Sequence, residues 1–184
     1  METVKKTEFE KFILDQLSCG GVKYAHSNTR EVTDILVEVY GIEWLLGTVA
    51  KYVYRFKNLG RERDLLKIAT YMFILWIKFG FHQKESERLE KGFVDTTIES
   101  KNKFFTQFTR DLEEYEARFE HISTDDDWPK RLNYFLSSLK KGRNVASIFS
   151  VYLVVRELWV RDFLNLNKAG QDTDTQVEKR TTEK

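Results

Sequence analysis

The chain has 184 residues, of which 41% are hydrophobic and 32% are charged, and its formal net charge is +1. This length and apolar content are sufficient for one domain with a hydrophobic core. Because the net charge is close to zero, any electrostatic recognition must come from local patches of charge. The only cysteine, Cys19, excludes an intrachain disulfide and a site with several cysteine ligands, and this composition fits the reducing cytoplasm.

Two helices are predicted within the first 41 residues of the chain. Residues 2–17 have an amphipathic pattern, and they lack the apolar core of a signal peptide. After a break and a loop, Asn28 or Thr29 is suited to cap a second helix. Gly41 is suited to end that helix, because glycine readily leaves the helical conformation.

A pair of longer helices follows, at about 42–57 and 61–79. The residues between them read Asn-Leu-Gly, and Gly60 suits the left-handed position that often closes a helix. So short a connection predicts that the two helices run antiparallel, as a helical hairpin over 42–79.

The charge-rich stretch that follows carries a seam of large apolar residues at steps of three and four. This spacing is typical of a heptad face, and it predicts a long helix. The seam either packs in the core or forms an interface between chains; we favour packing against the C-terminal helix, and we also expect a homo-oligomer. The seam consists of Phe105, Phe108, Leu112, Tyr115, Phe119 and Ile122.

The last helices follow an acidic break that contains the only proline, Pro129, which suits the first turn of a helix. Two helices are predicted, at 130–141 and at about 144–165. The basic segment 130–143 either binds phosphate or an acidic partner, or attracts the acidic stretch 111–127 from an adjacent helix. We favour the second interpretation.

Taken together, the pattern predicts an all-α fold, a bundle of six or seven helices. Residues 1–83 form the first part, 84–166 form a helical extension packed on it, and 167–184 form a disordered tail. The most apolar runs, 65–79 and 148–160, contain charges and are shorter than the roughly 20 residues of a bilayer span. We therefore expect no contact with a membrane.

The predicted hairpin contains an unusual set of cations among tyrosines. Gly47, Lys51 and Arg55 are spaced four apart, so they follow one face of the first helix. Arg63 and Lys67 share a face of the second helix. In an antiparallel hairpin these faces meet near the turn, and they would form a basic pocket.

A basic pocket of this kind suits phosphate, because lysine supplies a point charge and arginine a bidentate fork. Tyr52 or Tyr54 is suited to contact a base by stacking. Asp64 is the candidate for orienting a nucleophile or for holding a metal ion. The alternative is a solvated helix face, on which the stems of the cations cover apolar surface.

The same residues carry a resemblance to a known family. The segments "GTVAKYVYRFKNLG" and "RDLLKIATYM", within residues 26–79, resemble a small domain common in bacteriophage early proteins. That domain is catalogued as of unknown function or as a nucleotide kinase. The matching residues are Gly47, Lys51, Tyr52, Arg55, Asp64, Leu65, Lys67, Ala69 and Tyr71.

The resemblance implies a phage protein in the cytoplasm of a host cell that binds nucleotides. It further implies transfer of phosphate to deoxynucleoside monophosphates, with ATP or another nucleotide as donor and Mg²⁺ as cofactor. The chain has no G-x-x-x-x-G-K-[ST] loop, so cationic side chains would hold the phosphates. The implied roles are phosphate binding by Lys51, Arg55, Lys67 and Arg63, catalysis by Asp64 and His26, and base contact by Tyr52 or Tyr54.

Two departures from the family pattern leave the activity open. The family's asparagine after the glycine is Thr48, and its His-Tyr pair is replaced by Tyr-Ala-His, which ends at His26. A second hypothesis is therefore a binder without catalysis, whose ligand is a nucleotide, a nucleotide second messenger or single-stranded nucleic acid, directed against host defence. A helical scaffold that binds protein is a third.

Overall fold

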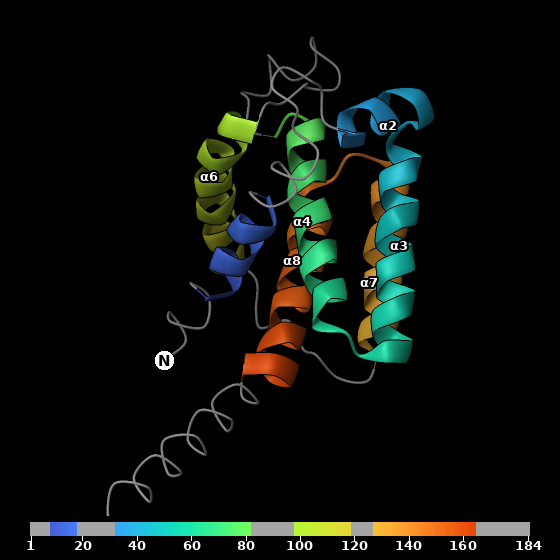
Figure 1. Cartoon of the computed structure of the whole chain (residues 1–184), viewed down its shortest axis with the longest axis vertical. Coiled ribbons are helices and arrows are strands. Elements are labelled where there is room, and N and C mark those ends of the chain that lie inside the picture. The colour runs from blue at the N-terminus through green and yellow to red at the C-terminus, as the bar shows by residue number, and fades with distance from the viewer. Residues whose placement is uncertain (1–7, 18–31, 82–97, 119–126, 165–184) are drawn as a thin grey trace, which may run out of the picture.

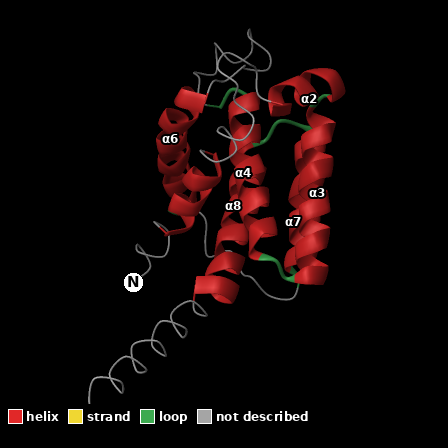
Figure 2. Cartoon of the chain, in the orientation of Figure 1, coloured by secondary structure: helices red, strands yellow, loops and turns green. Residues whose placement is uncertain are grey.

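The computed structural model describes residues 8–17, 32–81, 98–118 and 127–164 (Figure 1). Every regular element in these ranges is helical, which confirms the all-α prediction (Figure 2). The predicted caps Asn28 and Thr29, the catalytic candidate His26 and the tail 167–184 lie outside the described residues. The elements are a helix at 8–17, α2 (Val32–Tyr40), α3 (Ile42–Leu59), α4 (Glu62–Lys78), α6 (Ile98–Glu116), α7 (Trp128–Lys141), α8 (Val145–Trp159) and the π-helical turn η1 (Val160–Leu164).

The predicted hairpin is confirmed, with α3 and α4 joined by a tight turn. Gly60 has a φ of 58°, and its N–H donates to the carbonyl of Phe56 over 2.8 Å. A left-handed residue with this bond closes the last turn of a helix, and glycine adopts it without steric cost. Gly41, with a φ of 73°, separates α2 from α3 in the same way. The sequence therefore predicted the ends of α2 and α3 correctly.

Helices α3, α4, α8 and α7 form a four-helix bundle in which each helix packs against the next (Figure 1). Neighbours in the bundle run antiparallel. Phe56, near the end of α3, contacts Trp128, the first residue of α7, with ring centroids 5.5 Å apart. Trp159 ends α8, and its indole N–H donates over 2.8 Å to Glu62, the first residue of α4. Segments from both predicted parts of the chain therefore share one hydrophobic core.

The centre of the molecule is the pair α4 and α8. Helix α8 is apolar on nearly all sides, and a helix of that kind must be covered on all sides. Helices α3 and α7 cover one side of this pair, and α6 with the helix at 8–17 covers the other (Figure 1). None of the helices in the described ranges combines the length and the apolar content that a bilayer crossing requires.

The predicted seam of α6 packs into this core, as favoured from the sequence. Phe108 contacts Phe149 and Tyr152 of α8, with ring centroids 5.5 and 5.0 Å apart. Phe105 meets Phe73 of α4 edge to face, at 5.1 Å. The last two seam positions, Phe119 and Ile122, lie outside the described residues. The described part of the seam is thus buried within the chain.

The expected attraction between the acidic stretch 111–127 and the basic segment 130–143 is wrong for the described residues of α6, while residues 119–126 lie outside the described residues. Helices α6 and α7 lie on opposite sides of the central pair, so the acidic stretch of α6 does not face the basic residues of α7 (Figure 1). The two blocks meet locally, where Lys130 donates over 2.7 Å to Asp127, three residues earlier. Glu116 of α6 instead accepts a bond of 2.6 Å from Arg156 of α8. Which helices become neighbours depends on contacts between residues far apart in the chain, which periodicity does not predict.

Candidate functional site

The hairpin brings the predicted cations of α3 against a tyrosine. Lys51 Nζ lies 4.7 Å, and the guanidinium carbon of Arg55 lies 5.4 Å, from the ring centroid of Tyr52. Both distances are within the range of a cation–π interaction. Lys67 of α4 is half-buried and lies one turn before Tyr71. We call the set Lys51, Tyr52, Arg55, Lys67 and Tyr71 the cation–tyrosine face.

Aromatic contacts between the two helices support this face. Tyr52 stacks on Tyr71 of α4, with centroids 6.0 Å apart and an angle of 22° between the rings. Trp44 meets Tyr71 edge to face at 6.4 Å. Neither Trp44 nor Tyr71 was among the predicted site residues. Trp44 lies two turns before Tyr52 on the same helix face, and this spacing is the signal that could have found it.

Asp64 lies beneath the face, in the first turn of α4. Its side chain is 1% exposed, and its Oδ1 is 3.2 Å from a terminal nitrogen of Arg55, whose side chain is 36% exposed. Besides this ion pair, the carboxylate makes no hydrogen bond among the described residues. The helix N-terminus also favours a negative charge at this position. Asp64 therefore anchors Arg55 from below and leaves the outer side of the guanidinium open to solvent.

The surroundings of Asp64 do not fit a magnesium ion. Mg²⁺ keeps several waters and is held through one or two carboxylates together with substrate phosphates. Asp64 is buried, a cation already neutralises it, and no group of three potential ligands occurs within the described part of the chain. A role in orienting a nucleophile would require contact with substrate, which a buried side chain does not offer. In this arrangement Asp64 is a positioning residue for Arg55.

Of the other predicted site residues, Tyr54 and Gly47 lie away from the cation–tyrosine face, and Arg63 lies one turn before Lys67 on α4. Tyr54 follows Tyr52 by two residues, which turns it by about 200° around α3. Its side chain is 70% exposed and does not belong to the cation–tyrosine face. Arg63 is exposed in the first turn of α4. Gly47, which was expected at the far end of the pocket, lies instead on the side of α3 that faces α7.

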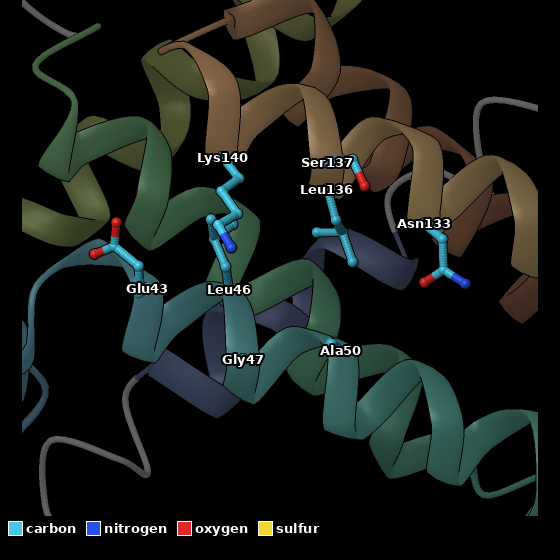
Figure 3. A pocket seen from close by; sticks show the side chains of 8 residues that line it. All are labelled: Glu43, Leu46, Gly47, Ala50, Asn133, Leu136, Ser137 and Lys140. Carbon is cyan, nitrogen blue, oxygen red and sulfur yellow. The ribbon is translucent and has the colours of Figure 1, made fainter.

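A groove between α3 and α7 is the second feature of interest (Figure 3). Its volume is about 380 Å³. Sequence reasoning missed it, because nothing in the hairpin indicates that α7 packs beside α3. The groove is lined by Glu43, Leu46, Gly47 and Ala50 of α3 and by Asn133, Leu136, Ser137 and Lys140 of α7.

Comparison with known proteins gives no match: no family model, no curated protein and no solved structure is similar to the chain. The resemblance of residues 26–79 to the phage domain therefore stays a prediction. The function has to be argued from the chemistry of the two surfaces on α3.

Proposed function

We propose that the chain binds a nucleotide through its phosphates on the cation–tyrosine face, without transferring phosphate. The observation that carries this proposal is the placement of Lys51 and Arg55 over the same ring of Tyr52. Two cations side by side on a partly exposed surface suit the clustered charges of a di- or triphosphate. The solvated helix face remains the competing interpretation.

Arg55 is well suited to hold a phosphate. A guanidinium has five N–H donors in a rigid fork, and the contact with Asp64 uses one terminal nitrogen. Because the side chain of Arg55 is 36% exposed, a ligand can reach the remaining donors. Because the buried carboxylate restrains the side chain, less conformational entropy is lost when phosphate binds. Lys67, on the facing helix, adds a third charge one turn before Tyr71, whose ring stacks on that of Tyr52.

The face favours phosphate recognition over base recognition. Tyr52 already stacks on Tyr71, and two cations lie near its ring. A base would have to displace one of these contacts. We therefore expect affinity to depend strongly on the number of phosphates and weakly on the identity of the base.

Binding without turnover fits this chemistry better than a kinase does. Phosphoryl transfer depends on positioned charges, a metal ion and a group that orients the nucleophile. Asp64, the candidate for the last two roles, is buried and ion-paired. Among the described residues, this face therefore offers no accessible carboxylate for the metal-binding or nucleophile-orienting role that a kinase requires.

The test is a titration of the full chain with ATP, ADP, AMP and adenosine by calorimetry. We expect affinity to rise with phosphate number, and Lys51→Ala to weaken ATP binding about tenfold, the value of one charge-assisted bond. Lys103→Ala, an exposed lysine of α6 across the molecule, is the matched control and should bind as the wild type does. Equal affinity for ATP and adenosine, or equal losses in both variants, would overturn the proposal.

A turnover assay separates the binder from the kinase. The chain is incubated with ATP, Mg²⁺ and each nucleoside monophosphate, and diphosphate is measured. We expect none. Diphosphate that is formed by the wild type and lost in Lys51→Ala would establish the kinase instead.

A further inference from the structure

The groove between α3 and α7 lies on a different side of α3 from the cation–tyrosine face. The contact of Phe56 with Trp128 sets the register of the two antiparallel helices. Within the groove, Ala50 lies opposite Leu136, and Leu46 lies opposite Lys140 (Figure 3). Leucine and alanine form an apolar floor, and amide, hydroxyl and charged side chains form polar rims. The groove thus offers apolar contact inside and hydrogen bonding at its edges.

The two helices that border the groove present mainly positive charge. Within α3 and α7 the only carboxylate is Glu43, at one end of the groove. Asp127, directly before α7, is held by Lys130. Basic residues along a groove are what a phosphate backbone requires. Besides Lys51, which belongs to the cation–tyrosine face, the exposed lysines of these helices are Lys57, Lys130, Lys140 and Lys141.

Two exposed tyrosines accompany these lysines. Tyr54 of α3 is 70% exposed, and Tyr134 of α7 is 71% exposed. The register places them about one helical turn, roughly 6 Å, apart along the bundle axis. Tyr134 is supported from below by an edge contact with Phe135, at 5.6 Å between centroids. Exposed rings beside cations are platforms on which bases stack.

Gly47 lines the groove without a side chain. It lies in the interior of α3, where glycine is less favourable than alanine. A Cβ atom built at this position meets no atom within 4 Å, so packing does not require glycine. Because Gly47 has no side chain, the floor of the groove is open here and a ligand can approach the backbone closely.

From these features we propose that the α3–α7 groove binds single-stranded nucleic acid. The phosphates would follow the exposed lysines of the two helices, of which Lys140 lines the groove, and the bases would enter the groove or stack on Tyr54 and Tyr134. A single strand fits better than a duplex, because its bases are free to reach an apolar floor and tyrosine rings. The inference does not rest on the proposed nucleotide site, which uses the side of α3 next to α4.

The test is fluorescence anisotropy of a labelled oligomer of twelve thymidines with the full chain, at 50 and 200 mM salt. We expect binding that weakens with salt, as the release of counterions requires. Tyr134→Ala should weaken binding about tenfold, the effect of one lost stacking platform. Lys140→Ala should weaken it and flatten the salt dependence. ATP should not displace the oligomer, because it binds elsewhere.

Gly47→Ala gives the most discriminating result. We expect the thermal midpoint to rise, because alanine favours the helix, and oligomer binding to fall, because the methyl group fills the floor. Gly142→Ala, a glycine outside the groove with open space around it, and Lys103→Ala are the controls. Absence of oligomer binding at 50 mM salt would overturn the proposal. So would equally tight binding of a duplex, or unchanged binding by both Tyr134→Ala and Gly47→Ala.

Discussion

The two faces of the molecule each contain an arginine–carboxylate pair, but the pairs are built in opposite ways. On the α3–α4 side, Asp64 is buried and Arg55 reaches the solvent. On the α6–α8 side, Arg156 is 2% exposed, and Glu116, 28% exposed, is the partner that reaches the solvent. In both pairs a charge inside the protein is compensated by an opposite charge at its edge.

The difference between the pairs determines what each face offers to a ligand. The buried carboxylate of the first pair directs a cation outward, beside Lys51 and Tyr52. The buried cation of the second pair instead has a carboxylate at the surface as its partner. The proposed binding of anions therefore assigns recognition to the first pair, whereas the second pair needs only a structural role.

The largest effect is expected from removing the carboxylate of the second pair. Glu116→Ala leaves Arg156 buried, with the carboxylate of Glu157 at 3.5 Å as the nearest compensation that remains. We expect a loss of about 3 kcal/mol in the free energy of unfolding, measured by urea denaturation. Glu113→Ala, an exposed glutamate of the same helix, should cost less than about 0.5 kcal/mol. Equal losses in the two variants would contradict a structural role for this pair.

The first pair should show a smaller effect, because Arg55 is partly hydrated. Arg55→Ala leaves the carboxylate of Asp64 buried without its counter-ion, and we expect a loss of about 2 kcal/mol. The double variant Arg55→Ala/Asp64→Asn should regain part of the lost free energy of unfolding, because the unpaired buried carboxylate has been removed. A double-mutant cycle measures the coupling of the two residues. Additive losses would mean that the two side chains do not stabilise one another.

Tyrosine hydroxyls on α6 and α8 allow a matched comparison. Burial raises the pKa of Tyr152, a nearby Glu10 adds to this effect, and its hydroxyl makes no hydrogen bond among the described residues. Tyr152→Phe should raise the free energy of unfolding by about 1 kcal/mol, because an unsatisfied buried group is removed. Tyr115→Phe should lower it by about 1 kcal/mol, because the hydroxyl of Tyr115 bonds Ser150 at 2.9 Å. Thermal unfolding of the two variants measures whether their changes in the free energy of unfolding have opposite signs.

The smallest effect is a dependence on pH at Asp111 of α6. Burial raises the pKa of this carboxyl, while the neighbouring Arg110 opposes the shift. A raised pKa in the folded state means that the ionised form costs stability above that pKa, and that this cost disappears as the pH falls below the ordinary value of 3.8. Asp111→Asn should therefore raise the thermal midpoint slightly at pH 7 and leave it unchanged at pH 3. A gain of the same size at both pH values would exclude ionisation as the cause.

The elements whose signals are local could be predicted. Gly41 and Gly60 end their helices because glycine reaches positive φ without steric cost, and this depends on a few neighbouring residues only. The seam of α6 was predicted to be buried against the C-terminal helix, because an apolar face needs a partner. Of the candidate site, the grouping of Lys51, Tyr52 and Arg55 with Asp64 followed from helix spacing and from the short turn.

What required the tertiary structure was the environment of those side chains. The spacing brought Asp64 to the site, but only the tertiary packing around α4 made it a buried anchor for Arg55. Likewise, only the tertiary structure shows that α7 packs beside α3. Gly47 consequently lines a groove that no local pattern indicates. Periodicity thus determined which face of each helix is apolar, whereas the choice of the helix that covers each face depends on contacts between residues far apart in the chain.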